Sequence, residues 1–174
     1  MDYTTLSKNA SSADNQQERL TLTIEPWFIS GFVDGEGTFH VAFAKRTDLP
    51  KQWAIIPEFH ISQHKDRASV LYEIQQYFNC GAIRENHAGR QNDVTQVFVV
   101  RNRNDLVQKI IPFFRSYPLR SQKKQDFEIF AEIVEAMNNR YHHSNEGFQL
   151  LVAKAFQMNS GGKYRKRKME EIVT

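Results

Sequence analysis

The chain has 174 residues, of which 40% are hydrophobic and 25% are charged, and these values are typical of a globular protein with one sizeable core. Its single cysteine, Cys80, excludes an internal disulfide and a zinc site built from cysteines. Apolar runs are all much shorter than the roughly 20 residues that span a bilayer, and no signal-peptide core is present. We therefore expect a soluble, intracellular protein.

The net charge of +3 is concentrated at one end of the chain. Residues 163–174 contain five Lys or Arg against two Glu, which accounts for the whole excess. Within the neutral remainder, residues 37–104 hold nine basic and six acidic residues and four of the six histidines. This concentration of positive and hydrogen-bonding groups predicts a surface that faces phosphate.

The first elements in chain order are a helix and two strands. Residues 1–23 are polar and without period, which predicts a flexible segment. Pro26 suits a first helical position, and the following apolar run predicts a helix from 26 to about 34 that ends at glycine. "TFHVAFAKR" and "WAIIPEFHISQH" alternate apolar and polar residues, which predicts two strands with one core face and one open face. Pro57 cannot donate to a ladder, so we expect it at a local edge or bulge.

Later elements repeat this order. "DRASVLYEIQQYF" predicts a helix, "GAIREN" and "TQVFVVRN" a hairpin, and "NDLVQKIIPFF" a helix with Asn104 as its cap. Two further helices are predicted in "SQKKQDFEIFAEIVEAM" and "SNEGFQLLVAKAFQM", before a mobile basic end. The resulting fold class is α+β, with the order αββαββα, a four-stranded antiparallel sheet covered by helices on one face, and extra C-terminal helices. We expect one domain over residues 24–157 and a basic tail over residues 158–174.

The segment "WFISGFVDGEGTFH" places Asp34 and Glu36 at the C-terminal end of a helix, where a negative charge is unfavourable. Trp27, Gly31 and Gly35 lie on one stripe of that helix, and the glycines permit close approach of a second helix. Because the chain has one such segment, the second helix is predicted to come from another copy related by a two-fold axis. Four carboxylates would then meet at the axis, where divalent cations would neutralise them. The alternative is a helix stop followed by a turn.

The same residues resemble a known family. "ISGFVDGEG" is similar to the nine-residue motif of LAGLIDADG homing endonucleases. Four residues match the motif: Gly31, Asp34, Gly35 and Gly37. Glu36 stands at the position of the catalytic acid. "PEFHISQHKDR", "GAIREN", "FVVRNRNDLVQKIIPF" and "PLRSQKKQDFEIF" follow in the order of the family's elements, so the resemblance covers roughly residues 24–137. It implies a homodimer that hydrolyses both strands of a long, nearly palindromic DNA duplex and leaves short 3′ overhangs.

The resemblance also implies roles for individual residues. Glu36 would bind the metal and act catalytically, the Gly35 carbonyl would be a second ligand, and Asp34 would support the helix end as a lesser candidate ligand. Gln63 and Arg67 match two residues of a pocket that orders the attacking water. A lysine of "SQKKQ" matches the third; the helical register favours Lys123 over Lys124. The implied cofactor is Mg²⁺, with Mn²⁺ or Ca²⁺ as possible occupants of the site.

Specificity is expected on the open face of the sheet, where an antiparallel ribbon fits the major groove. The candidate DNA-binding residues are polar side chains of the strands and flanking loops: His40, Arg46, Lys51, Glu58, His60, Ser62, Arg84, Asn86, Arg90 and Gln96.

Two other functions stay open at this point, an RNA-binding intron maturase and a non-catalytic DNA-binding regulator on the same fold. Retention of the acid at position 36 disfavours the regulator and only weakly disfavours the maturase. The expected partners are double-stranded DNA and a second copy of the chain, with no membrane and no small-molecule substrate. The expected location is an organelle, chloroplast or mitochondrion, or a bacterial cytoplasm, wherever the encoding DNA lies.

Overall fold

The computed structural model describes residues 24–86, 94–161, 165 and 167–173. In chain order its elements are α1 (Pro26–Glu36), β1 (Gly37–Lys45), β2 (Trp53–His64), η1 (Lys65–Arg67), α2 (Ser69–Phe78), β3 (Ala82–Glu85), β4 (Thr95–Val100), α3 (Arg103–Asp105), η2 (Leu106–Ile110), α4 (Ile111–Ser116), α5 (Lys123–Asn138), η3 (Tyr141–His143), α6 (Asn145–Gly161) and α7 (Glu170–Val173). The predicted α+β class and the predicted element order are confirmed.

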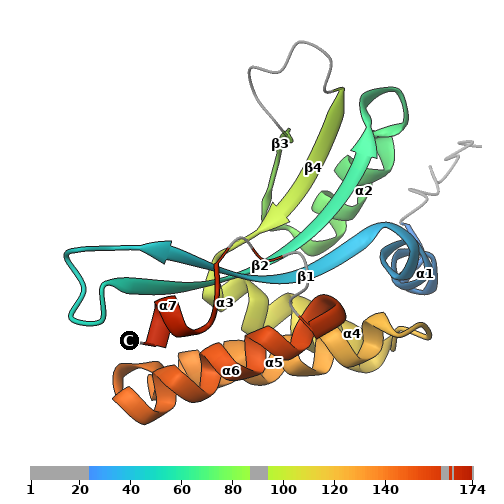
Figure 1. The fold of residues 1–174 in the computed structure, drawn as a ribbon. Helices are drawn as coiled ribbons and strands as arrows, with labels where there is room; N and C mark the ends of the chain where they lie inside the picture. The colour runs from blue at the N-terminus through green and yellow to red at the C-terminus, as the bar shows by residue number, and fades with distance from the viewer. Residues whose placement is uncertain (1–23, 87–93, 162–164, 166, 174) are drawn as a thin grey trace, which may run out of the picture.

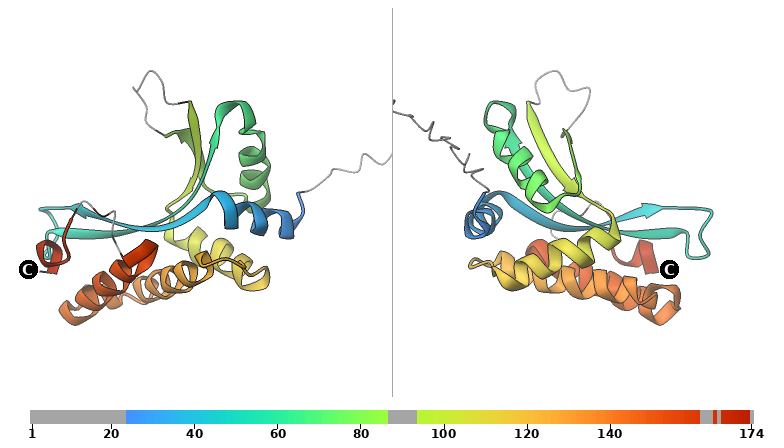
Figure 2. Two further views of the ribbon diagram at one scale, coloured as in Figure 1. Left: turned by 45° about the vertical axis from the view of Figure 1, so that its right-hand side comes forward. Right: turned by 180° about the vertical axis from the view of Figure 1, so that it is seen from behind.

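One antiparallel sheet of four strands organises the fold, in the order β1-β2-β4-β3. The β1–β2 hairpin pairs Gly37 with Ile61 at its base and Lys45 with Trp53 near its tip. The sheet is strongly bent, so that β3 and β4 rise away from the hairpin while α4, α5 and α6 lie under its other face (Figures 1 and 2). One concave face is therefore left without a helix.

Pro57 occupies the position that its chemistry requires. It pairs with Val41 of β1, but the pairing of β2 with β4 starts only at Phe59. Pro57 therefore has a neighbouring strand on one side only, and the expected local edge is confirmed.

The core lies between the sheet and the helices and is rich in phenylalanine. Phe39 of β1 is fully buried, and its ring centroid lies 5.2–5.4 Å from those of Phe59, Phe114, Phe127 and Phe130. These partners come from β2, α4 and α5. Burial of each such ring contributes about 1.5–3 kcal/mol, so this cluster is what fixes the helical layer to the sheet.

The C-terminal residues differ from the expected mobile tail. α6 continues to Gly161, past the expected boundary at 158, and Ile172 of α7 is 2% exposed. Arg165 donates hydrogen bonds to the carbonyls of Val41 (2.7 Å) and Ala155 (2.6 Å). In the described part of this segment, Arg165 is thus held by carbonyls of β1 and α6 and by the rings of Phe43 and Phe156.

One helix cap is also corrected. The side chain of Asn102, and not that of Asn104, accepts hydrogen bonds from the amides of Asn104 and Asp105. The helical stretch therefore starts at Arg103, two residues earlier than a cap at Asn104 predicts. Across the described ranges, every helix is too short or too polar to cross a bilayer.

Candidate active site and nucleic-acid interface

Asp34 lies in the last turn of α1 and is fully engaged within the chain. Its carboxylate accepts hydrogen bonds from the amides of Arg120 (2.8 Å) and Ser121 (3.0 Å) and from Ser121 Oγ (2.5 Å). Burial raises the pKa of Asp34, but these hydrogen bonds and the charge of Lys123 outweigh that effect, so its pKa lies below the usual value. Asp34 therefore joins α1 to the turn before α5, and metal binding by Asp34 would compete with these bonds.

Glu36 lies two residues further on and is in the opposite situation. Its side chain is exposed, and no donor among the described residues bonds to its carboxylate. Nor do the described residues contain three acidic, histidine or cysteine side chains close enough to hold a metal ion. The described residues of one chain thus present an exposed carboxylate without a hydrogen-bond partner.

Lys123 meets both acids from the first turn of α5. Its ammonium donates to the carbonyl of Val33 (2.9 Å) and lies 3.4 Å from that of Gly35, at the negative end of α1. Burial lowers the pKa of Lys123, against the opposing charges of Asp34 and Glu36. Lys124 is exposed, so of the two lysines left open by the sequence, Lys123 is the one beside the acids.

Gln63 and Arg67 lie at the neighbouring end of the sheet. Gly37, the residue after Glu36, pairs with Ile61 of β2, and Ile61 precedes Gln63 by two positions. Gln63 is half-buried at the end of β2, and Arg67 is exposed in η1. Neither forms a hydrogen bond or ion pair with Glu36 within the described chain.

The outward face of α1 is apolar and bare. Trp27 and Phe28 are 54% and 53% exposed. A Cβ atom built at Gly31 or Gly35 would meet nothing within 4 Å, so the chain's own packing does not require glycine at either position. At Gly37, in contrast, a Cβ atom would lie 2.5 Å from Val33 Cγ1, so that glycine serves the turn from α1 into β1.

The strand register decides which candidate DNA-binding side chains share the concave face. Residues that pair directly across strands lie on the same face of the sheet. The pairs on the concave face are His40 with Glu58, His60 with Val99, Ser62 with Val97, and Val97 with Arg84. Gln96 pairs with Gln63 and Glu85 and so belongs to the opposite face. Its predicted place on the open face is wrong, because residues that alternate along a strand point to opposite sides.

The concave face has a charged cluster that its sequence pattern did not reveal. The Glu58 side chain is only 7% exposed, accepts a hydrogen bond from His60 Nε2 (2.7 Å) and forms an ion pair with Arg101. Arg101, which follows β4, was not among the predicted residues. Burial, Arg165 and His60 lower the pKa of the neighbouring His40, so its ring favours the neutral form.

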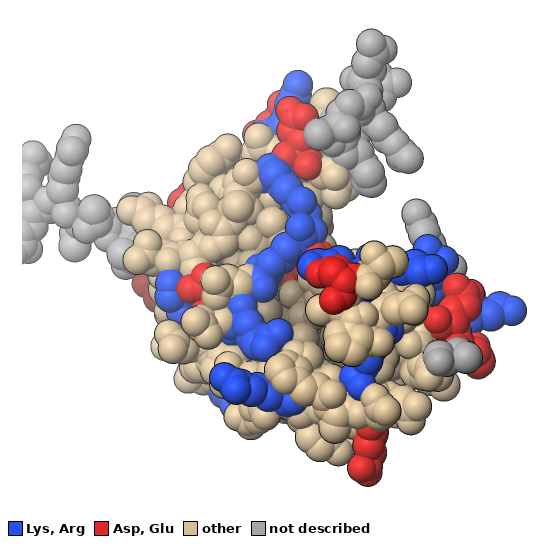
Figure 3. Space-filling model, turned by 90° about the vertical axis from the view of Figure 1, so that its left-hand side faces the viewer, with Lys and Arg blue, Asp and Glu red and all other residues tan. Residues whose placement is uncertain are grey.

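Two basic loop candidates have partners within the chain. Arg46 forms a two-point ion pair with Asp48 (2.8 and 2.7 Å), and the Lys51 ammonium bonds to Asn145 at the start of α6. Asn86 and Arg84 are exposed near the other rim, and Arg90 lies outside the described residues. Seen from the hairpin side, Lys and Arg side chains follow one another in a line across the molecule (Figure 3).

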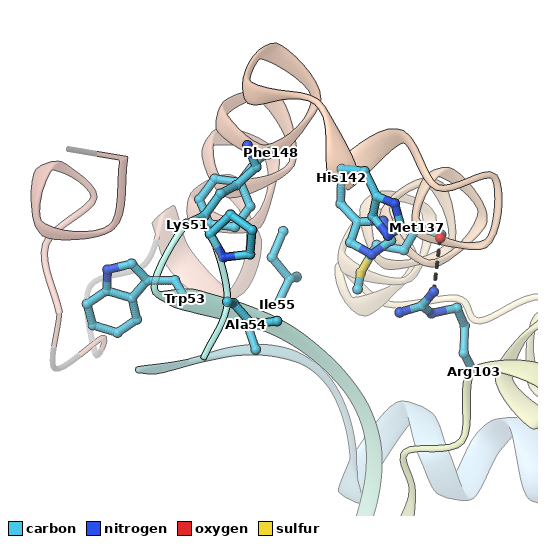
Figure 4. Close-up of a pocket in the computed structure, with 11 residues that line it drawn as sticks. Lys51, Trp53, Ala54, Ile55, Arg103, Met137, His142 and Phe148 are labelled. Atoms are coloured by element: carbon cyan, nitrogen blue, oxygen red, sulfur yellow. Dashed lines mark hydrogen bonds between the residues drawn. The ribbon is translucent and has the colours of Figure 1, made fainter. Parts of the chain in front are cut away.

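A separate pocket lies at the hairpin tip, far from α1. This cavity of about 530 Å³ is lined by apolar residues together with Lys51, Arg103, His142 and His143, and it contains no acid (Figure 4). Nδ1 of His142 is buried without a hydrogen-bond partner among the described residues. Burial and the charges of Arg103 and His143 lower the pKa of His142 to about 4. None of the residues that line this pocket belongs to α1.

The bent sheet with one open face, and a helix that ends in a free acid beside it, define a saddle-shaped αββαββα protein. A sequence model described as LAGLIDADG endonuclease matches residues 29–134, which is more than half of the chain. The chain therefore belongs to the LAGLIDADG endonuclease family, and the predicted resemblance is confirmed.

Individual relatives agree with this assignment. "Probable intron-encoded endonuclease 3" of Neurospora crassa is 33% identical over 81% of this chain, which spans only 26% of that protein. The solved structure of the homing endonuclease I-TnaI has a TM-score of 0.79 and 33% identity, over 88% of this chain and 100% of that one. I-SmaMI, bound to an uncleaved DNA target in the presence of calcium ions, has a TM-score of 0.72 and 29% identity, over 78% of this chain and 45% of that one.

Proposed function

We propose that the chain is a site-specific DNA endonuclease that works as a homodimer and uses divalent metal ions. The observation that carries this proposal is the contrast at the end of α1. Asp34 accepts hydrogen bonds from Arg120 and Ser121, whereas the exposed Glu36 carboxylate accepts none from the described residues. A free carboxylate next to a half-buried lysine and an open sheet face suits cleavage of a phosphodiester held on that face.

The bare face of α1 supports the homodimer. Trp27 and Phe28 are exposed, and on the same helix a Cβ atom at Gly31 or Gly35 would meet nothing within 4 Å among the described residues. Exposed aromatic side chains beside small residues mark a surface that another helix covers. The described residues contain one such helix. The chain aligns with 45% of the I-SmaMI chain, which is the share expected if two copies form one complete site.

The donor set fits hard divalent cations. Two Glu36 carboxylates about 5 Å apart across a two-fold axis would repel by roughly 3 kcal/mol at an effective dielectric constant of about 20. Glu36 and the Gly35 carbonyl would hold Mg²⁺, with Mn²⁺ or Ca²⁺ as substitutes, since such ions prefer carboxylate and carbonyl oxygens. When bound, the metal supplies an acidified water and stabilises charge on the phosphate.

The chain's own residues would complete the chemistry. Lys123 keeps a positive charge at the end of α1, where the scissile phosphate would lie. Gln63 and Arg67, at the adjoining end of β2 and in η1, would orient the attacking water and bind phosphate oxygens. The enzyme would cut both strands across the minor groove, and the products would be DNA ends with short 3′ overhangs.

A cleavage assay with a matched variant tests the proposal. Wild-type protein with Mg²⁺ is expected to cut a subset of a duplex library, and a chelator is expected to abolish cutting. Glu36→Gln is expected to lower the rate by at least roughly 10²- to 10³-fold, because a metal ligand contributes several kcal/mol. Glu73→Gln, which neutralises an exposed glutamate of α2, is the control and should cut normally.

The outcomes separate the alternatives. DNA binding without cutting under every metal condition would contradict the endonuclease and favour the non-catalytic regulator. Tight binding to intron RNA in place of DNA would favour the maturase. Equal cutting by wild type and Glu36→Gln would contradict the role of Glu36 alone.

The cellular location follows from the same proposal. The Neurospora relative is named as intron-encoded. We expect an intron in an organellar or bacterial genome to encode this chain, and the protein to act in the compartment that holds that DNA.

A further inference from the structure

The concave face contains a buried acid in a place where the proposed DNA substrate would lie. Glu58 is on β2, an inner strand, and its side chain is 7% exposed. The pair Phe59↔Val100 puts the next residue after β4, Arg101, directly opposite Glu58. A buried acid is unfavourable next to phosphate, so its presence here needs an explanation.

Arg101 supplies that explanation through the way it is held. Its Nε atom is the one that contacts Glu58 Oε1, and its side chain is 50% exposed. Neither terminal nitrogen donates a hydrogen bond to another of the described residues. The other Glu58 oxygen binds His60, which fixes the carboxylate from the second side. Glu58, on the sheet, thus orients the guanidinium through Nε, and the half-exposed side chain of Arg101 is accessible to solvent.

The charge and position of this pair favour a base over a phosphate. A guanidinium paired with a carboxylate has a total charge near zero, and the carboxylate repels an approaching phosphate. The edge of guanine offers two neutral acceptors, O6 and N7, that match two parallel N–H groups. Arg101 projects from the inner strands and not from a rim of the sheet. Side chains of the inner strands are the ones that meet the base edges at the floor of a groove.

We propose that Arg101 recognises one guanine in each half-site through its two terminal nitrogens, and that Glu58 and His60 are its positioning residues. The inference rests on the proposed function, because it takes duplex DNA as the ligand. Glu58 lies three residues along β2 from Ile61, which pairs with the residue after Glu36. At about 3.3 Å per residue and about 3.4 Å per base pair, the guanine is roughly three base pairs further from the dimer axis than the bases level with Glu36.

Selection of binding sites tests the assignment without requiring cleavage. The full chain selects duplexes from a library with randomised half-sites, in Ca²⁺, and the enriched bases are compared with those of variants. Wild type should enrich guanine at one position per half-site, by on the order of 10- to 100-fold over the other bases. Arg101→Gln should lose that preference and keep the others. Arg101→Lys should also lose it, because lysine keeps the charge but lacks the fork.

Controls make the result specific to the geometry. Arg115 is 49% exposed and paired with Glu135 on the helical layer, so Arg115→Gln is a matched change away from the concave face and should keep every preference. Glu58→Gln should weaken the guanine preference and steepen the salt dependence of binding, since it frees a positive charge. Melting temperatures of all variants establish that they are folded.

Each contrary outcome has a definite meaning. If Arg101→Gln weakens all sequences equally and reduces the salt slope by about one phosphate contact, Arg101 binds phosphate and the proposal is overturned. If the selected sequences are identical to those of wild type, Arg101 is structural and the proposal is again overturned. If wild type itself enriches no sequence, the proposed endonuclease fails together with this inference.

Discussion

The end of α1 and the free edge of β1 both carry backbone or side-chain groups that no neighbouring strand or helix covers. The two regions differ in how far other residues of the chain bond to these groups. At the edge of β1, the Phe39 carbonyl accepts from Asn159 Nδ2 (3.0 Å) and the Val41 carbonyl from Arg165 (2.7 Å). The Arg165 guanidinium also stacks over Phe43 and Phe156, at 5.3 and 4.9 Å from their centroids. This edge is closed from within the chain.

The end of α1 is closed only in part. Asp34 and the carbonyls of Val33 and Gly35 have internal partners. Within the described residues, the Glu36 carboxylate has none, and a Cβ atom at Gly31 or Gly35 would meet nothing within 4 Å. The difference teaches how to separate support from function here. Groups with complete internal bonding hold the fold, and the groups left open are those that the proposed function assigns to a second chain, a metal ion or DNA.

The largest expected effect comes from filling the open face of α1. Gly31→Leu is expected to weaken the proposed dimer by more than about 100-fold, because a side chain blocks close helix approach, and to abolish cleavage with it. The monomer should stay folded, since a Cβ atom at Gly31 meets nothing within 4 Å. Sedimentation and urea unfolding measure the two quantities separately.

Gly37→Ala is the matched control for that variant. Its Cβ atom would lie 2.5 Å from Val33 Cγ1, so this change should lower the free energy of unfolding. Should Gly31→Leu destabilise the monomer as much as Gly37→Ala does, the open face of α1 would have an internal role and the comparison would break.

The next effect concerns Asp34. Asp34→Ala removes the acceptor for the amides of Arg120 and Ser121 and is expected to lower the free energy of unfolding by about 2–3 kcal/mol. Glu36→Gln should leave unfolding unchanged, because it loses no internal bond. Equal stability losses in the two variants would contradict the division of roles between the acids.

The pH dependence of stability sharpens the same point. The folded-state pKa of Asp34 lies below its ordinary value of 3.8, so the unfolded state takes up the proton first. The stabilisation from Asp34 is therefore complete above the unfolded pKa and is lost as pH falls through the folded one. Urea unfolding between pH 6 and pH 2.5 should show a shallower decline for Asp34→Asn than for wild type.

A smaller effect is expected at the β1 edge. Arg165→Met removes two hydrogen bonds to backbone carbonyls but retains apolar contact with Phe43 and Phe156, so unfolding should become easier by about 1–2 kcal/mol. Cleavage per folded dimer should stay close to wild type. A cleavage defect without a stability loss would show that this segment serves DNA and not the edge.

The smallest expected effect tests His142, a group without an internal partner that lies outside the proposed site. Its pKa of about 4 lies below the ordinary 6.5, so the unfolded state binds the proton more tightly and stability falls as pH drops from about 6.5 towards 4. His142→Phe should flatten this decline in thermal melts. An unchanged decline would mean that the ring is protonated in the folded protein.

Much of this molecule was predictable because its signals are local. The strand alternation, the Pro57 edge and the acids after a glycine-bearing helix all follow from residues close in sequence, and the choice of Lys123 over Lys124 followed from the period of one helix. The cap at Asn102 was missed by two residues because several polar residues there satisfy the same local rule.

The misplaced predictions share another cause. Gln96 was assigned to the wrong face because its position depends on pairing with β2 and β3. Glu58 was expected to be open, and Arg101 was overlooked, because their contact joins two strands about forty residues apart. Arg165 was taken for part of a mobile tail because its partners, Val41 and Ala155, belong to other elements.

The sequence by itself determined the family, the order of elements and the identity of the acid pair, since these depend on residue types at short spacing. Only the tertiary structure decided which of the two acids is free. Burial and hydrogen bonding by Ser121, 87 positions away, engage Asp34 and leave Glu36 exposed. The difference is physical: propensity and pattern act along the chain, whereas the bonding of a carboxylate depends on which distant groups the fold brings against it.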